Sequence, residues 1–271
     1  IKSGVLTMFF QEPVTPAWVM RRPGDSLFTS RGTPRPGRTG RLRTGPRTGL
    51  LGGSFNPAHG GHRRISLFAL EALGLDEVWW LVSPGNPLKP KEGMAPLHAR
   101  YASAVKMARR APIRVTAIER ELGTRYTIDT LEALQSRYPK REFVWLMGSD
   151  NLVTFHRWKA WRRIARRLPI AVIARPGYEM ATVASPAAAL LRRFRMDAAR
   201  FRNTTFTNRG KWSAPTLVTL RFDPDDRSAT AIRAGEPDWA QDYVGRHASA
   251  SLRDQITHRR IEGADPEPGR A

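Results

Sequence analysis

Short apolar runs alternate with amphipathic stretches from about residue 49 onward. The run Val78-Trp79-Trp80-Leu81-Val82 is apolar at every position, which is typical of a strand that is covered on both faces of a parallel sheet. We therefore expect strands at 49–51, 77–83, 113–119, 142–147, 170–174 and 217–222. Helices are expected at 62–73, 96–110, 129–137, 158–167, 186–195, 228–234 and 238–256. Together these elements predict an α/β domain with crossover helices.

The boundaries of this domain follow from the composition on either side of it. Residues 31–48 consist almost entirely of Arg, Gly, Pro and Thr and offer little to bury, so the basic stretch 1–48 is expected to be a disordered extension. The α/β domain is expected over 49–258, and 259–271 is expected to be a polar C-terminal tail. A chain of 271 residues with 41% hydrophobic residues can form one main core.

Composition also excludes several classes of chemistry. The chain contains no cysteine, which excludes disulfides, thiolate zinc sites and cysteine nucleophiles. It has no apolar stretch of the roughly 18–20 residues that cross a membrane. No apolar signal core follows a charged N-terminus, so the expected location is the cytoplasm.

Charge is the unusual bulk property. The chain has 45 Lys and Arg against 24 Asp and Glu, a net charge of +21, which favours polyanionic partners: nucleic acid or small nucleotides. Residues 1–48 carry nine basic and two acidic residues. That segment could be an extension without function, a nucleic-acid-binding arm or a transit peptide, although its prolines and glycines oppose the amphipathic helix of the last.

The loop after the first expected strand holds the candidate chemistry. It reads GGSFNPAHGGH over residues 52–62, and a helix is expected to begin at about His62. Gly52 and Gly53 would let the backbone turn sharply and approach a ligand, while amides at the helix start could bind phosphate. His59 and His62 are three residues apart and would lie on one side of the first helical turn.

Residues 53–57 (GSFNP) followed by His59-Gly60-Gly61-His62 resemble the H-x-G-H signature of the nucleotidyltransferase superfamily. This resemblance implies a Rossmann-like, doubly wound parallel sheet with helices on both faces. A zinc site at the two histidines lacks a visible third ligand. A dinucleotide-binding dehydrogenase is excluded because the loop lacks G-x-G-x-x-G.

Later segments are similar to the bacterial nicotinate mononucleotide adenylyltransferase family. Residues 83–90 (SPGNPLKP) follow the second strand, where that family has a proline-rich loop with a lysine, here Lys89. Residues 125–131 (RYTIDTL) resemble its nicotinate-binding segment, and residues 145–161 resemble its loop with an aspartate and a tryptophan, here Asp150 and Trp158. Residues 174–177 and 227–233 complete a resemblance that covers about 50–233.

The resemblance implies that AMP is transferred from ATP to nicotinate mononucleotide, giving deamido-NAD and pyrophosphate in NAD biosynthesis. A phosphate monoester, with a second pKa of about 6, is mostly a dianion at pH 7, so the reaction needs alignment and charge neutralisation rather than a base. Mg²⁺ is expected to come through the ATP phosphates, because it seldom has an all-protein cage, and no protein metal ligand is expected.

The same resemblance assigns roles to individual residues. The catalytic residues would be His59, His62 and Arg233, with His62 at the α-phosphate. The residues that bind ATP would be Gly53, Ser54, Phe55, His59, His62, Gly148, Asp150, Arg175, Ser228, Thr230 and Arg233. The acceptor would be bound by Asn56, Lys89, Thr127 and Trp158.

Structural roles compete with several of these assignments. Thr127, Asp129, Asp150 and Ser228 could be only helix caps, and Lys89 only a solvated charge. Trp158 and Trp161 could be core or surface anchors. Ala229 stands where the family often has a second hydroxyl residue, which makes Thr230 the weaker assignment. The predicted catalytic set leaves out His98, Arg100 and His156. His98 and Arg100 are expected at the surface, and His156 is expected to orient its loop.

Two other functions stay open on sequence alone. One is another H-x-G-H adenylyl- or cytidylyltransferase with a different phosphorylated acceptor, against which residues 126–131 and 155–161 argue. The other is a basic nucleic-acid-binding protein, for which no motif accompanies the charge. We therefore expect ATP and nicotinate mononucleotide as partners, and neither nucleic acid nor a membrane.

Overall fold

The structure is a computed structural model that describes residues 45–85, 93–174, 184–203, 213–221, 229–241, 243 and 252–261. All of these residues belong to the second of the two units of the chain, Arg41–Ala271. Within the described residues, no helix is both long and apolar enough to cross a membrane.

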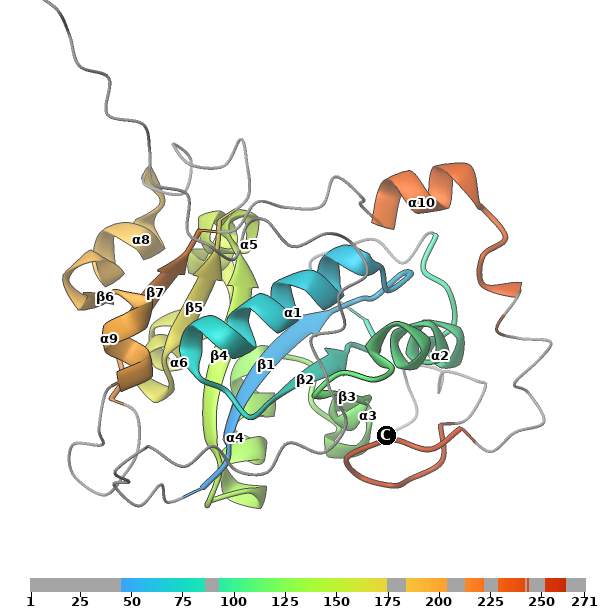
Figure 1. Cartoon of the computed structure of the whole chain (residues 1–271), viewed down its shortest axis with the longest axis horizontal. Coiled ribbons are helices and arrows are strands. Elements are labelled where there is room, and N and C mark those ends of the chain that lie inside the picture. Colours follow the sequence, from blue (N-terminus) through green and yellow to red (C-terminus); the bar gives the residue numbers. More distant parts are fainter. Residues whose placement is uncertain are drawn as a thin grey trace, which may run out of the picture. The chain divides into compact units, whose positions relative to one another are not determined.

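A seven-stranded sheet forms the centre of this unit, and every neighbouring pair of strands is parallel (Figure 1). The strand order is β3-β2-β1-β4-β5-β7-β6. The strands are β1 (Arg47–Gly53), β2 (Glu77–Val82), β3 (Ile113–Thr116), β4 (Glu142–Gly148), β5 (Ile170–Ile173), β6 (Arg195–Met196) and β7 (Leu217–Leu220).

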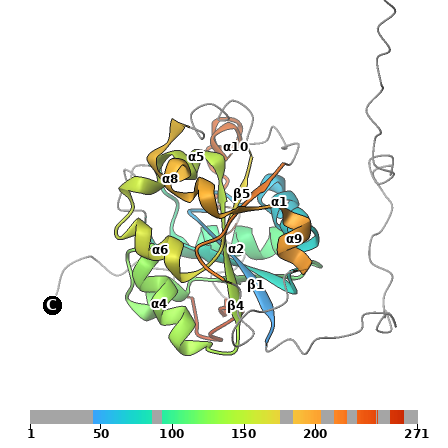
Figure 2. The ribbon, with the colours of Figure 1, turned by 90° about the vertical axis from the view of Figure 1, so that its left-hand side faces the viewer.

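Helices cover both faces of the sheet, as the view along its edge shows (Figure 2). One core cluster joins the sheet to α1 (Gly60–Leu73), α2 (Leu97–Ala108) and α9 (Ala198–Asn203). On the other face the second cluster takes in α3 (Ile118–Leu122), α4 (Thr127–Arg137), α5 (Ser149–Thr154), η1 (Phe155–Arg157), α6 (Trp161–Arg167) and α8 (Pro186–Leu191). The remaining described helices are η2 (Arg192–Phe194) and α10 (Ala229–Gly235).

The strand order predicts where a ligand would bind: at the carboxyl ends of β1 and β4. From β1 the chain first proceeds outward through β2 to β3, and it then returns to the other side of β1 to form β4. In open α/β sheets, ligands bind where the order reverses in this way. Because all strands are parallel, the segments that follow β1, β2, β4 and β5 leave the sheet at one common edge.

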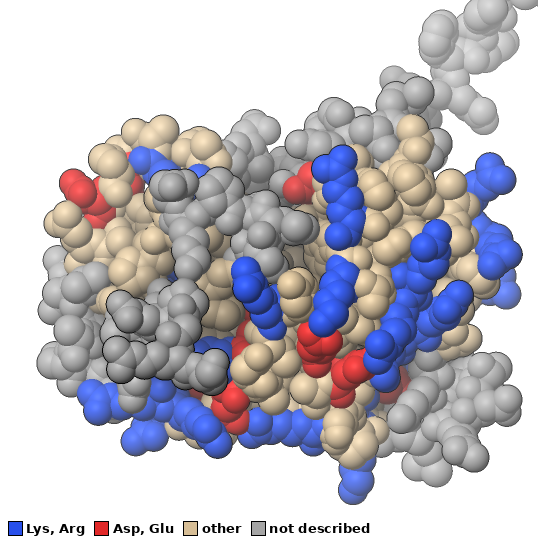
Figure 3. All heavy atoms as spheres, turned by 180° about the vertical axis from the view of Figure 1, so that it is seen from behind, with Lys and Arg blue, Asp and Glu red and all other residues tan. Residues whose placement is uncertain are grey.

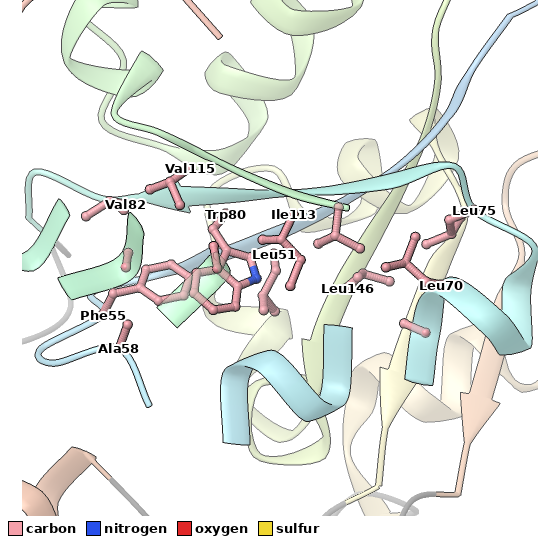
Figure 4. Packing of buried hydrophobic residues seen from close by; sticks show 14 of the residues in the cluster. Leu51, Phe55, Ala58, Leu70, Leu75, Trp80, Val82, Ile113, Val115 and Leu146 are labelled. Carbon is pink, nitrogen blue, oxygen red and sulfur yellow. The ribbon is translucent and has the colours of Figure 1, made fainter. Parts of the chain in front are cut away.

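The first core cluster fixes the loop after β1. Phe55 is 1% exposed, and its ring stacks on Trp80 of β2 with the ring centroids 5.1 Å apart (Figure 4). Ala58 lies beside Phe55 in the same cluster. The Trp80 indole N–H donates to Ser66 Oγ of α1 at 2.8 Å, so that its one polar atom is satisfied inside the core.

The expected fold class is confirmed: a doubly wound parallel sheet with helices on both faces. The six expected strands are present, and most boundaries differ by one to three residues. The strand expected over 113–119 is wrong at its end, because it stops at Thr116 and α3 begins at Ile118. The buried Asp254 accepts a hydrogen bond from the amide of Ala117 at 2.6 Å, which removes this amide from any further sheet pairing.

Several helices also differ from the sequence prediction. The helix expected to start at Trp158 starts at Trp161, and the helix expected over 186–195 ends at Leu191 before η2 and β6. The short elements α3, α5, α9 and β6 were not predicted. Each has at most six residues, which is too few to show a periodic pattern.

The helix expected over 238–256 is wrong at its C-terminal end, where residues 252–261 form a turn with a bridge between Arg253 and Arg260. This segment covers the open edge of β3: Gln255 Oε1 accepts from the amide of Val115 at 2.7 Å, and the hydroxyl of Tyr101 donates to the Val115 carbonyl at 2.9 Å. Burial raises the pKa of Tyr101 above its ordinary value, so this hydroxyl stays a donor. The boundary expected at 258/259 stays a prediction.

Candidate active site

Gly52 and Gly53, which precede the H-x-G-H motif, are needed for close packing. A Cβ on Gly52 would lie 2.8 Å from Cη2 of Trp145, because the indole of this β4 residue lies across the backbone of β1. A Cβ on Gly53 would lie 3.3 Å from the ring of Phe55. The left-handed backbone in this loop is at Phe55, with a φ of 48°, which its buried ring holds in place. The sharp turn expected at the glycines is therefore made two residues later.

His59 and His62 cap the first turn of α1 reciprocally. Nδ1 of His59 accepts from the amide of Gly61 at 3.2 Å, and Nδ1 of His62 accepts from the amide of His59 at 3.2 Å. This is the geometry of a capping box, in which imidazoles take the places usual for Ser and Glu. The two rings are 3.9 Å apart between centroids, and His59 is 8% exposed.

These caps determine which ring nitrogen can donate. A nitrogen that accepts from a backbone N–H carries no hydrogen, so the proton of each neutral imidazole must be on Nε2. Both histidines therefore present an N–H donor on the side of the ring opposite the cap. Donors fixed in advance at a helix N-terminus are suited to anionic phosphate oxygens.

Arg233 of α10 reaches the same loop, although 171 residues separate it from His62 in sequence. Its guanidinium donates from Nη1 to the carbonyl of Asn56 at 2.5 Å and from Nη2 to Oγ1 of Thr230 at 3.3 Å. In Figure 1, α10 lies on the side of the sheet where α1 begins. The structure thus places Arg233 and Thr230 at the loop that carries the predicted residues Asn56, His59 and His62.

The side chain of Asn56, which is predicted to bind the acceptor, holds a neighbouring loop segment in the structure. Its Nδ2 donates to the carbonyl of Gly93 at 2.8 Å, and its Oδ1 accepts from the amide of Ala95 at 3.1 Å. Both polar atoms of the buried side-chain amide thereby hold the segment before α2. Arg233 contacts the backbone carbonyl of Asn56.

Arg100 is the main site-supporting residue that sequence reasoning missed. The expectation of a surface position is wrong: Arg100 is 0% exposed. Its guanidinium group donates to the carbonyls of Ala95 at 2.7 Å, Ser54 at 2.8 Å, Ser83 at 2.7 Å and Pro84 at 3.3 Å. It therefore ties the loops after β1 and β2 to the start of α2, and a planar fork of donors explains why arginine suits this position.

The end of β4 lies beside the end of β1, as the register Leu51 to Leu146 requires. Gly148 is the N-cap of α5 and Asp150 is in its first turn, so Asp150 is not itself the cap residue. Trp158 follows η1 and is partly buried, with its ring edge-on to Trp145 at 6.3 Å and to Phe155 at 5.4 Å.

Trp161 belongs to the core, whereas Trp158 is only partly buried. Thr127 is the first residue of α4, and the N-cap Tyr126 makes no side-chain cap bond, so a capping role does not explain this segment. Lys159 Nζ lies 4.4 Å from the centroid of the Tyr126 ring and pairs with Asp129 at 3.1 Å. These contacts connect the segment of Trp158 with that of Thr127.

Three predicted residues, Lys89, Arg175 and Ser228, lie outside the described residues. Among the described part of the chain there is no group of three His, Cys, Asp or Glu residues that could hold a metal ion. The assignment of individual site residues to ATP and to the acceptor stays a prediction.

The fold and the paired histidines define a nucleotidyltransferase-type domain, and the comparison with family models agrees. Residues 50–235 match the model of the Cytidylyltransferase-like family. A curated relative from Erythrobacter litoralis, named "Probable nicotinate-nucleotide adenylyltransferase", is 70% identical over 222 residues, covering 82% of this chain and 97% of the relative. A relative of the same name from Parvibaculum lavamentivorans is 52% identical over 192 residues, covering 71% and 93%.

The chain belongs to the nicotinate-nucleotide adenylyltransferase family, and the resemblance expected from the motifs is confirmed. Among solved structures it is similar to Plasmodium falciparum nicotinic acid mononucleotide adenylyltransferase complexed with NaAD. That match has a TM-score of 0.51 at 14% identity and covers 70% of this chain and 83% of the other. It supports the fold.

Proposed function

We propose that this chain transfers the adenylyl group of ATP to nicotinate mononucleotide, giving deamido-NAD and pyrophosphate in NAD biosynthesis. Its relatives at 70% and 52% identity carry the name of this activity and are matched over nearly their whole length. The observation that carries the proposal is the reciprocal cap, which fixes two imidazole Nε2–H donors beside the helix N-terminus at the strand-order reversal.

The chemistry requires positioning and charge neutralisation. An oxygen of the acceptor phosphate attacks the α-phosphorus of ATP, the bond from that phosphorus to the bridging oxygen breaks, and pyrophosphate leaves with the electron pair. We assign His62 to the α-phosphate, where negative charge grows in the transition state. We assign His59 to the neighbouring phosphates of ATP. Arg233 and Thr230 hold the terminal phosphates. Mg²⁺ enters as part of the ATP substrate.

The acceptor end is assigned to the segments of Thr127 and Trp158. The Trp158 ring is held edge-on by Trp145 and Phe155, which leaves a face for stacking on a pyridine. The backbone at the start of α4 supplies amide donors, and these suit a pyridine carboxylate better than a neutral amide.

A matched pair of substitutions at His62 separates its two roles. Asparagine places a cap acceptor where Nδ1 stands but has no atom at Nε2. Glutamine is a usual residue at this position of a capping box, and its side-chain amide has both an acceptor for the cap and a donor that reaches the Nε2 position. His62→Asn should keep the stability of the wild type and lose more than about 100-fold in turnover, the scale of one transition-state donor. His62→Gln should also keep the stability of the wild type, and it should retain more activity than His62→Asn because its amide nitrogen supplies a donor.

The substrate is tested with a panel of acceptors. Pyrophosphate release is measured with MgATP and, in turn, nicotinate mononucleotide, nicotinamide mononucleotide and pantetheine phosphate, and each product is identified by mass. Preference for nicotinate mononucleotide is expected. Faster turnover of pantetheine phosphate, or normal turnover in His62→Asn, would overturn the proposal or the role of His62, respectively.

The charged surface does not favour the nucleic-acid alternative. On the face in Figure 3, Lys and Arg side chains lie along the lower rim and over the right-hand half, with Asp and Glu between them. Three basic residues of the described chain pair with acidic residues of α4: Lys159 with Asp129, and Arg163 and Arg167 of α6 with Glu132. Such pairs leave less charge for a polyanion.

A further inference from the structure

Lys159 links the two segments to which the acceptor is assigned. It directly follows Trp158, and its ammonium group lies at the first turn of α4, where Thr127 is the first helical residue. Its Nζ is 3.1 Å from Oδ2 of Asp129 and 4.4 Å from the centroid of the Tyr126 ring. One side chain therefore makes an ion pair and a cation–π contact with the same helical turn. We call these two contacts the Lys159 clip.

The turn after Lys159 has an unfavourable backbone conformation. Ala160, the next residue, has a φ of 51°, which is the left-handed region that disfavours a residue with a Cβ. On one side of Ala160, the buried Trp161 fixes the start of α6 in the core. On the other side, Trp158 is only partly buried, and the Lys159 clip holds the adjacent residue to α4. The side that carries Trp158 is therefore the one that needs a further contact.

The partners of Lys159 belong to a turn that is anchored in the core. The Tyr126 carbonyl accepts from the amides of Asp129 at 3.0 Å and Thr130 at 3.1 Å, so both partners lie in the first turn of α4. Ile128, which lies between them in sequence, is 1% exposed and belongs to the second core cluster. The Lys159 clip thus connects the segment of Trp158 to a fixed point of the fold.

Other ion pairs between α4 and α6 lie beyond the first turn of α4. The two helices lie side by side on one face of the sheet (Figure 2). Glu132 of α4 pairs with Arg163 and Arg167 of α6. These pairs hold the two helices to each other, whereas Lys159 precedes α6 and reaches the first turn of α4. Loss of the Lys159 clip should therefore leave the packing of the helices intact and affect the segment of Trp158.

We propose that Lys159 is a positioning residue: through Tyr126 and Asp129 it keeps the segment of Trp158 at the start of α4, in the arrangement that receives the pyridine ring of the acceptor. This inference rests on the proposed function, which assigns the acceptor to these two segments. When the arrangement that binds a ligand is only partly populated, the apparent affinity falls by that fraction. Loss of the Lys159 clip should therefore raise the KM for the acceptor, and kcat should stay nearly unchanged because the complex, once formed, is the same.

The test replaces Lys159 by methionine, which keeps the aliphatic part of the side chain and removes the ammonium group. With saturating MgATP, the KM for nicotinate mononucleotide should rise about 3- to 10-fold, the scale of one exposed ion pair together with one exposed cation–π contact. The KM for MgATP and kcat should change by less than about twofold. Lys159→Arg, whose guanidinium can make both contacts, should keep the KM within about twofold of the wild type.

Arg163→Met is the matched control, because it also removes an exposed positive charge that pairs with α4 and leaves the Lys159 clip intact. The side chains of Lys159 and Arg163 are 51% and 61% exposed, so the two substitutions remove charge from similar surroundings. The KM of Arg163→Met for nicotinate mononucleotide should stay within about twofold of the wild type. An equal rise in this control, or a KM of Lys159→Met within about twofold of the wild type, would refute the role of Lys159.

A double-mutant cycle of Lys159→Met and Asp129→Asn tests the contact itself. The two effects on the KM for nicotinate mononucleotide should not add, because each substitution removes the same ion pair. Additive effects, or a fall of kcat in Lys159→Met as large as the rise of its KM, would count against positioning through this contact.

Hydrogen exchange without substrate separates this test from the test of the proposed function. Peptides that contain residues 124–130 and 155–161 should exchange faster in Lys159→Met than in the wild type, and at the wild-type rate in Arg163→Met. If no pyridine nucleotide is turned over, the proposed function fails, and the exchange result still decides whether Lys159 holds the two segments together. Equal exchange in all three proteins would overturn this link.

Discussion

Arg100 offers the sharpest test of how the site is held together, because one fully buried side chain binds carbonyls of three separate segments. Replacing it by methionine preserves the length of the side chain and removes every donor. Three carbonyl groups, those of Ser54, Ser83 and Ala95, would then lose a charged partner inside the protein.

The expected cost follows from these contacts. A hydrogen bond that involves a charged group contributes about 1.5–3 kcal/mol, so the three bonds shorter than 3 Å set a scale of roughly 4.5 kcal/mol or more. Relaxation of the loops and entry of water reduce this figure, and we expect Arg100→Met to lower the free energy of unfolding by about 3–5 kcal/mol. In a domain of this size the melting temperature would fall by about 10 °C.

Urea unfolding monitored by tryptophan fluorescence measures this change. Lys106→Met on the same helix is the control, because Lys106 is exposed and should change the stability by less than about 0.5 kcal/mol. Arg100→Lys should lie between the two, since one ammonium group cannot reach all three carbonyls as the fork does. A loss below about 1 kcal/mol in Arg100→Met would show that the site loops do not depend on this residue.

Three further predictions concern stability. Gly52→Ala should cost about 1–3 kcal/mol, because its Cβ would lie 2.8 Å from Trp145, whereas Gly235→Ala, with no atom within 4 Å, should change the free energy of unfolding by less than about 1 kcal/mol; similar losses would contradict the packing role. Asp254→Ala should lose about 3 kcal/mol in urea unfolding, because the buried carboxylate accepts four hydrogen bonds, and an unchanged midpoint would speak against its role in covering β3. Burial raises the pKa of Glu119, on α3, to about 7, which means that the folded state binds a proton more tightly than the unfolded state. The stability of the wild type relative to Glu119→Gln should therefore be highest below pH 4.5 and fall by an amount on the order of 3 kcal/mol as the pH rises through 7. Parallel curves of stability against pH for the two proteins would refute this.

The strand pattern was predictable because the strands of a doubly covered sheet are apolar on both sides. The run from Val78 to Val82 is buried along its whole length, as the continuous apolar sequence indicated. The loop with His59 and His62 was predictable because its residue types are specific. Its detailed geometry was not, since the capping role of the imidazoles depends on which ring atom faces which amide.

The apolar pattern is misleading where one apolar run continues from a strand into a helix. Residues 113–119 were predicted as one strand, but the chain turns into α3 because the distant Asp254 accepts the hydrogen bond of the Ala117 amide. The pattern of residues 113–119 cannot predict this contact, because Asp254 lies far away in the sequence. The helix predicted over 238–256 is wrong over 252–256 for the same reason, because Gln255 in this part binds the edge of β3.

The burial of Arg100 and that of Asp254 were both missed, and they share one physical cause. This cause also indicates where supporting residues of such a site should be sought. A charged side chain is buried only when polar groups compensate it, and here those groups come from segments that are far apart in the chain. The loops at the carboxyl edge of a parallel sheet leave the regular ladder, so their carbonyls need other donors. A buried cation such as Arg100 provides these donors, and a buried acid such as Asp254 accepts from the amide of Ala117 and the hydroxyl of Thr116. Charged residues near the carboxyl edge are therefore candidates for holding the loops, even when helical periodicity would place them at the surface.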